Sequence, residues 1–138
     1  MSNVLPADTF IVVNKTVLSD KDRNVLMLLY QPIIGSQSIS LYYTLWSYLD
    51  KSELLSNEWT HHHLLRDMMI SNQEFSESKE KLEAIGLIKT YVKKGNINNY
   101  VYELNRIARE KHGTRFIDRI ENIGNKINIL SSFLDLFS

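Results

Sequence analysis

The stretch LLYQPIIGSQSISLYYTLW (residues 28–46) places a proline and a glycine between two apolar runs. Proline disfavours helical geometry at the residue before it, so Pro32 predicts that a first helix, beginning near Ser19, ends at about Tyr30. Gly35 reaches backbone conformations that other residues avoid, and it predicts a turn. The stretch is therefore expected to form a corner between two buried helices.

The second helix is predicted over about residues 37–50, with Ser36 or Ser38 as its N-terminal cap. Ile33 and Ile34 are expected to hold the corner by hydrophobic contact. Two adjacent apolar stripes run along this helix, a width typical of a central helix with neighbours on most sides. The stripes are Ile39, Tyr42, Trp46 and Leu49, beside Leu41, Leu45 and Tyr48.

Shorter elements flank these two helices. The β-branched residues of TFIVV (residues 9–13) favour a short strand or an extended arm. Two further helices are expected, one near residues 58–69 and one from Ser71 to a stop at Gly86. Their inward residues are predicted to be Leu64, Leu65, Met68 and Met69 in the first, and Phe75, Leu82 and Ile85 in the second.

Apolar and polar residues alternate through LIKTYVKKGNINNYVYEL (residues 87–104), which predicts two strands about a Gly-Asn turn. One strand face carries Ile88, Thr90 and Val92, and the other strand's face carries Tyr100, Tyr102 and Leu104. Three helices followed by a hairpin is the order of a winged helix. The predicted fold is mainly α with a small β-hairpin: an extended winged helix over residues 1–105, with an N-terminal arm and an extra helix.

Residues 106–138 are predicted to form a basic linker and a C-terminal amphipathic helix. Apolar residues recur there at alternating spacings of four and three, which is the heptad pattern of helices that pack on one another. Such a helix must bury its apolar side against the domain or another copy. The seam residues, all candidate interface residues, are Phe116, Ile120, Ile123, Ile127, Leu130, Leu134 and Phe137.

The overall composition is that of an ordinary globular protein, with 43% hydrophobic and 23% charged residues. Sixteen basic and sixteen acidic residues cancel, so no overall field attracts nucleic acid or an anionic membrane. The absence of cysteine excludes disulfides, thiolate zinc sites and cysteine nucleophiles. Neither a secretory signal nor a membrane-spanning run is evident, so a cytoplasmic protein without direct membrane insertion is expected.

Catalytic and metal-binding patterns are weak. His61, His62 and His63 are consecutive, whereas histidines that share a metal on one helix usually stand four residues apart, so a structural or incidental role is predicted for them. The sequence has no GxSxG motif and no glycine-rich phosphate loop. We therefore expect no enzymatic activity.

DNA binding is the function that a winged helix suggests first. The expected recognition helix, residues 74–85, carries four glutamates against two lysines, which is unfavourable beside phosphates. The candidate phosphate contacts are therefore on the wing and after it: Lys89, Lys93, Lys94, Arg106, Arg109 and Arg115. Two interpretations stay open, a weak sequence-independent DNA contact and a role of the lysines in protecting an edge strand.

The hairpin tyrosines, Tyr91, Tyr100 and Tyr102, are also open to two interpretations. They have the chemistry to stack on bases. Tyrosines in a hairpin that packs on helices more often belong to a core or to a protein–protein interface, where tyrosine is enriched. We take them as candidate interface residues.

The blocks LLYQPIIGSQSISLYYTLWSYL, THHHLL, LEAIGLIKTYV and YVYEL resemble, in this order, one known family. The resemblance, over about residues 4–105, is to the N-terminal domain of the DnaB/DnaD-type primosomal helicase-loader proteins of Gram-positive bacteria. This is the family of the replication initiation and membrane attachment protein DnaB. It implies a self-associating winged helix that helps to recruit the replicative helicase, without catalysis or a cofactor. The positions that it marks as fold-defining are Tyr30, Gln31, Pro32, Gly35 and Trp46.

Full-length members of that family continue into a second helical domain associated with single-stranded DNA binding and oligomerisation. Residues 106–138 do not resemble the family linker, so the chain is expected to be a shortened or diverged relative. Whether it keeps loading activity or competes with a full-length member stays open.

Two functional hypotheses follow. The first is a non-enzymatic module of DNA replication initiation or restart, a homo-oligomer that contacts replication initiation proteins or the replicative helicase. Its expected surfaces are the hairpin, residues 88–104, and the heptad helix, residues 116–137. The second is a small winged-helix DNA-binding regulator, with the wing and the basic stretch after it on phosphates.

Overall fold

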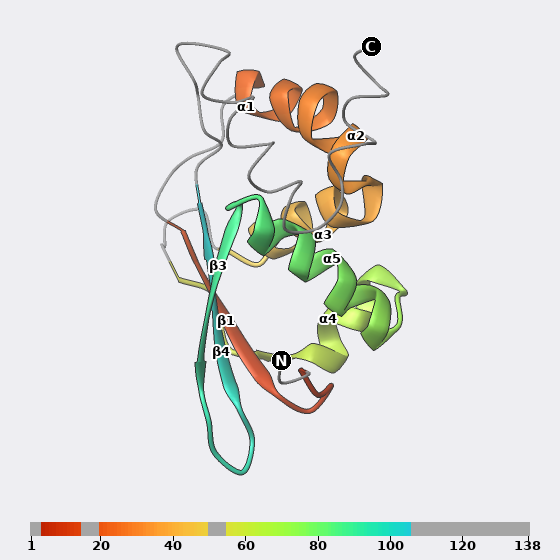
Figure 1. Cartoon of the computed structure of the whole chain (residues 1–138). Helices are drawn as coiled ribbons and strands as arrows, with labels where there is room; N and C mark the ends of the chain where they lie inside the picture. Colours follow the sequence, from red (N-terminus) through yellow and green to blue (C-terminus); the bar gives the residue numbers. More distant parts are fainter. Residues whose placement is uncertain (1–3, 15–19, 50–54, 106–138) are drawn as a thin grey trace.

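The computed structural model describes residues 4–14, 20–49 and 55–105, in which helices cover one face of a four-stranded sheet (Figure 1). The expected order of three helices and a hairpin is present, preceded by an extra helical segment. In chain order the elements are β1 (Thr9–Asn14), α1 (Asp20–Val25), the π-helix η1 (Leu26–Tyr30), α2 (Gln31–Ile34), α3 (Ser36–Ser47), β2 (Trp59–Thr60), α4 (His61–Met68), α5 (Asn72–Ala84), β3 (Ile88–Lys93) and β4 (Asn99–Leu104).

The sheet has the strand order β2-β1-β4-β3. The predicted hairpin is confirmed, with β3 antiparallel to β4 and Thr90 opposite Tyr102. The arm is confirmed as a strand, β1, but it also lies in the sheet, parallel to β4 with Val12 beside Tyr102. The sequence predicted the hairpin but not its pairing with β1, because a parallel partner so distant in the chain leaves no local pattern.

The helical backbone does not end at Tyr30, before Pro32, so that prediction was wrong. The backbone stays helical through Gln31 and Pro32 to Ile34, with one wide π turn before them. In that turn the Gln31 N–H donates to the Leu26 carbonyl, five residues back. A regular α-helix would press the proline ring against the carbonyl of the fourth residue before it, and the wider turn relieves this clash.

Gly35 forms the predicted corner. Its φ of 89° lies in the region that favours glycine. Ile33 and Ile34 are buried beside it, as expected. Neither serine caps α3 through its side chain, contrary to the prediction, because Gly35 itself occupies the cap position.

The helix α3 is the central helix that its two stripes predicted. Its buried residues include Leu41, Tyr42 and Leu45, and Trp46 packs partly buried against the core. It is tied to α5 where the Ser38 hydroxyl donates to the Ser78 carbonyl, at 3.4 Å. At the far side, the Tyr42 hydroxyl donates to the Asn105 carbonyl, at 2.9 Å, and so fixes the end of the hairpin.

The helices α4 and α5 follow their predicted signals, with one exception. The side chains of Ser71 and Glu74 form a reciprocal capping box at the start of α5, and Gly86 ends it at a φ of 81°. Met69 was predicted to face inward but is 91% exposed, because it ends α4 in the left-handed conformation, with a φ of 55°. The inward residues Leu64, Phe75, Leu82 and Ile85 are buried, while Leu65 and Met68 are partly buried.

None of the helices in these described ranges has the length and hydropathy that crossing a bilayer requires.

Candidate interaction surfaces

The helix α5 occupies the place of the DNA-reading helix in a winged helix, and its outer face is acidic. Glu74, Glu77 and Glu80 are exposed, while Lys79 is bound by Glu83 at 3.2 Å. The main-chain N–H of Ser71, with further help from Gln37, holds the pKa of Glu74 below its usual range. These carboxylates therefore repel phosphates at neutral pH.

The wing presents the positive charge that was predicted for it. Lys89, Lys93 and Lys94 are all exposed. The ammonium of Lys89 lies 5.3 Å from the ring centroid of Tyr91, and the Tyr91 hydroxyl donates to Glu103 at 3.2 Å. This side of β3 thus offers a short basic and aromatic surface.

Tyr91 is the one hairpin tyrosine that offers a partner much surface, since 43% of it is exposed. Tyr100 and Tyr102 are 4% and 0% exposed, because their strand turns them toward the helices. Their rings meet the edge of the His61 ring at centroid distances of 5.5 and 5.7 Å. The structure gives these two tyrosines a core role, and the interface role stays a prediction for Tyr91.

His61 joins three parts of the fold and is fully buried. Its Nδ1 donates to the Asp8 carbonyl at 2.6 Å, and its Nε2 accepts from the Tyr102 hydroxyl at 2.7 Å. Burial lowers its pKa to about 4, although Asp8 opposes the shift. The structural role predicted for this histidine is confirmed, and both nitrogens are occupied by the protein.

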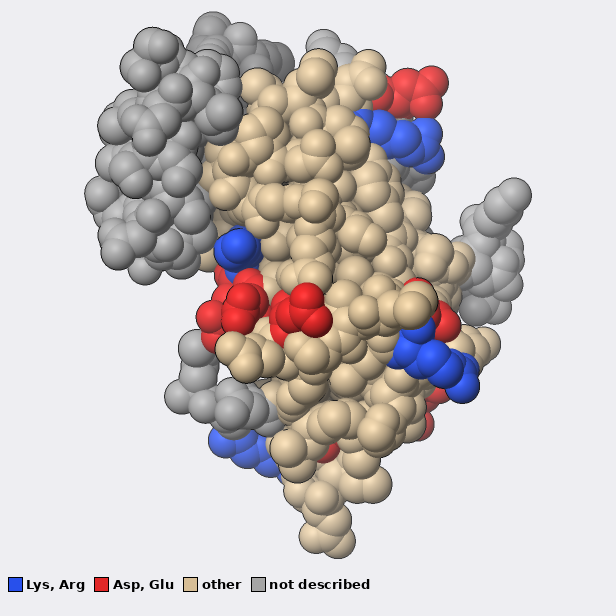
Figure 2. All heavy atoms as spheres, turned by 90° about the vertical axis from the view of Figure 1, so that its right-hand side faces the viewer, with Lys and Arg blue, Asp and Glu red and all other residues tan. Residues whose placement is uncertain are grey.

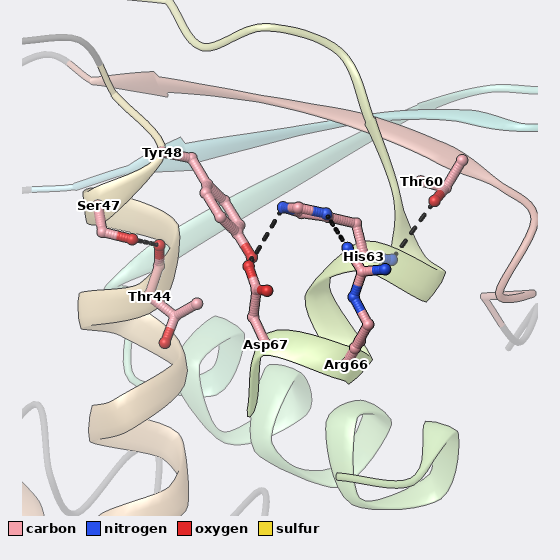
Figure 3. Close-up of polar contacts among 7 residues, drawn as sticks. All are labelled: Thr44, Ser47, Tyr48, Thr60, His63, Arg66 and Asp67. Atoms are coloured by element: carbon pink, nitrogen blue, oxygen red, sulfur yellow. Dashed lines mark hydrogen bonds and ion pairs between the residues drawn. The ribbon is translucent and has the colours of Figure 1, made fainter. Parts of the chain in front are cut away.

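His63 belongs to a polar network between α4 and the end of α3 (Figure 3). Its Nε2 lies 3.2 Å from an Asp67 carboxylate oxygen, which also accepts from the Tyr48 hydroxyl at 2.7 Å. Arg66 donates to its Nδ1 at 3.2 Å, and Trp59 stacks on the ring with centroids 4.2 Å apart. Both nitrogens of this histidine are therefore engaged as well.

The start of α4 has no unpaired amide for an anion in its first three residues. The N–H groups of His61 and His62 donate to the carbonyls of Asp8 and Pro6, and that of His63 donates to the Thr60 hydroxyl. In the described ranges, no three His, Asp or Glu side chains gather as a metal site would require. The side chains of His61 and His63 act as parts of the fold, while His62 is exposed.

The remaining predicted site residues lie outside the residues that the structure describes. These are the basic residues Arg106, Arg109 and Arg115 and the heptad residues Phe116, Ile120, Ile123, Ile127, Leu130, Leu134 and Phe137. The boundary predicted at residue 105 falls at the end of the described chain.

Residues 4–113 match the family model of the DnaB N-terminal winged helix domain. The chain belongs to this family. The resemblance proposed from the aromatic corner and the hairpin is thereby confirmed. Of the positions that it marks as fold-defining, Tyr30 is buried and Gly35 forms the corner.

Two relatives carry the DnaB name. The replicative helicase loading/DNA remodeling protein DnaB of Staphylococcus aureus (strain NCTC 8325 / PS 47) is 32% identical over 100 residues, which are 72% of this chain and 22% of that protein. The crystal structure of primosome protein DnaB (residues 1–300) from Geobacillus stearothermophilus is 32% identical, with a TM-score of 0.71. The matched region is 94% of this chain and 51% of the chain in that crystal structure. The winged-helix domain thus spans about a fifth of the curated relative.

One surface of this winged-helix domain was missed in the sequence. No Lys, Arg, Asp, Glu or His occurs in residues 24–49, which form η1, α2, α3 and their immediate flanks. The signal was the length of this uncharged run in a chain that is 23% charged. The apolar stripes account for the buried sides of these helices, but they give no indication that the outer sides are also uncharged.

Proposed function

We propose that this chain is a non-enzymatic module of DNA replication initiation that acts in the cytoplasm through self-association and contacts with primosomal proteins. The observation that carries the proposal is membership of the DnaB winged-helix family combined with an acidic α5. The family gives the process, since the named relatives are a helicase-loading and a primosome protein. The acidic helix argues against groove reading and favours protein partners.

Contacts with a replicative helicase and with a full-length DnaB are the partner part of the proposal. The test is co-purification of the tagged chain with each of these proteins, produced from one host, at two salt concentrations. Retention of either protein would support the module, and failure with both, in a chain that is folded by circular dichroism, would contradict this part.

Self-association is tested by light scattering of the whole chain over a hundredfold range of concentration. The heptad segment is probed by Ile123→Lys together with Ile127→Lys, with Asn122→Lys as a control off the seam. A multimer that the seam variant alone dissociates would assign assembly to residues 116–137. A multimer unchanged by both would place the contact elsewhere in the chain.

A second function, weak DNA binding through the wing, is favoured by the exposed Lys89, Lys93 and Lys94. Binding of this type neutralises phosphates, so affinity for random duplex should fall steeply between 50 and 200 mM salt. Replacing Lys93 and Lys94 by Gln should reduce the slope of log K against log salt by about 2. Equal slopes in the wild type and this variant would remove the wing from the contact.

A further inference from the structure

The surface made by η1, α2 and α3 carries no charged side chain, since residues 24–49 contain none. Figure 2 shows part of this surface as a continuous tan area over the helices drawn at the top of Figure 1, with charged atoms gathered at its borders. Met27 and Leu28 are 44% and 71% exposed on it. An uncharged surface with exposed apolar residues is typical of a contact site.

A shallow groove of about 460 Å³ crosses this surface between η1 and α3. Small hydroxyl residues form its α3 wall and allow another backbone to approach closely. Its lining is Met27, Gln31, Ser36, Ile39, Ser40, Tyr43, Thr44 and Ser47.

Two of these hydroxyls are satisfied within α3 itself. Thr44 donates to the carbonyl of Ser40 at 2.7 Å, and Ser47 donates to the carbonyl of Thr44 at 2.6 Å. Hydroxyls bonded back to their own helix need no outside partner, so a second surface can cover them without leaving donors unpaired. The wall is therefore chemically closer to an apolar surface than its composition suggests.

We propose that this groove is the contact between two copies of the chain. The inference rests on the proposed self-association and names its surface. In a two-fold contact each side chain near the axis meets its own copy, so a charge there faces a like charge. A groove without charges meets itself without repulsion, and it offers no feature that would select an acidic or a basic partner.

Other described surfaces are poorly suited to self-pairing. β3 is an edge strand, and antiparallel pairing of two copies centred on Tyr91 would put Lys89 opposite Lys93 of the partner subunit. A two-fold contact centred on the outer face of α5 would bring its exposed glutamates together. Like charges thus disfavour both of these surfaces, whereas the groove of η1 and α3 has no charged residue in its lining.

A charge placed on Ser40, which is exposed in the middle of the groove wall, tests the proposal. Ser40→Glu and Ser40→Lys should each raise the dissociation constant of the dimer at least tenfold, measured by sedimentation equilibrium. An equimolar mixture of the two variants should restore a dimer, because a two-fold axis puts the glutamate opposite the lysine. Glu80→Lys, a charge change on the exposed face of α5, is the matched control and should leave the dissociation constant unchanged.

A covalent test uses the absence of cysteine from the chain. Ser40→Cys should form a disulfide-linked dimer under mild oxidation, and Glu80→Cys should stay monomeric on a non-reducing gel. Circular dichroism of every variant confirms that it folds.

The outcomes separate the groove from the proposed function. If Ser40→Glu and Ser40→Lys each dimerise as tightly as the wild type, the groove is not the contact. Self-association itself would then still stand. A wild-type chain that is monomeric at all concentrations would overturn both. A monomer whose cysteine at position 40 resists thiol reagents would show that the same chain covers the groove, and would also overturn the proposal.

Discussion

Protonation of His61 should destabilise the domain as the pH falls from 6.5 toward 4. The pKa of His61 is about 4 in the folded chain, because the ring is buried, and 6.5 is its ordinary value. Between these two values the unfolded chain binds more protons than the folded chain, so the free energy of unfolding rises with pH. The contribution of His61 is complete above 6.5 and lost on approaching 4.

The magnitude follows from the two pKa values. Near pH 5 the unfolded chain holds about 0.9 proton more at this site, which gives a slope of about 1.2 kcal/mol per pH unit. From pH 7 to pH 5 the loss is about 1.8 kcal/mol, a large part of the stability of a small domain.

The assay is urea unfolding followed by tryptophan fluorescence at several pH values from 4.5 to 7.5. His61→Gln keeps an amide that can donate and accept but removes the titration, so the slope of stability against pH should fall by about 1 kcal/mol per unit near pH 5. His62→Gln, at an exposed position, is the control and should keep the wild-type slope. Equal slopes in the wild type and His61→Gln would refute the assignment of the pH dependence to this buried ring.

Three further substitutions test local features of the fold. Met69→Gly should raise the free energy of unfolding by about 0.5–1 kcal/mol in urea, because glycine accepts the left-handed conformation that Met69 adopts while exposed; a decrease would show that the methionine side chain is needed there. Ser71→Ala should lower the stability by about 1 kcal/mol through loss of the capping box with Glu74, and a melting temperature equal to that of the wild type would contradict the cap. Tyr102→Phe should cost about 1–3 kcal/mol, since it leaves the buried Nε2 of His61 without a donor, and a neutral result would show that this hydrogen bond does not stabilise the fold.

Local sequence signals predicted which helices and strands form, but they did not predict the backbone geometry at Pro32. The capping residues Ser71 and Glu74 and the alternation after Gly86 are nearest-neighbour signals, and the elements they predicted are present. Pro32 was expected to end the helix. Instead, the backbone widens into a π turn before Pro32, and the helix continues to Ile34. Burial of Leu26 and Tyr30 within that turn, and of Ile33 and Ile34 after it, stabilises a geometry that no local propensity favours.

Long-range contacts could not be predicted from the sequence, because no local pattern marks them. The parallel pairing of β1 with β4 and the place of His61 between Asp8 and Tyr102 join residues that are 41 or more positions apart. Nothing near His61 distinguishes it from His62 and His63, and only the fold buries the first of the three. The exposure of the wing lysines was predictable because alternation along a hairpin places one side of an edge strand toward solvent.

Charge distribution separates the two functions proposed for this winged-helix domain. Contact between copies through an uncharged groove depends on burial of apolar surface, which salt weakens little and kosmotropic salts strengthen. Contact of the wing with DNA depends on counterion release, which salt weakens steeply. A chain with exposed lysines on its hairpin and a neutral surface on η1 and α3 can therefore keep an assembled state at salt concentrations that release it from DNA. The acidic face of α5 strengthens this separation, because it opposes the close approach of phosphates that the winged-helix fold would otherwise allow.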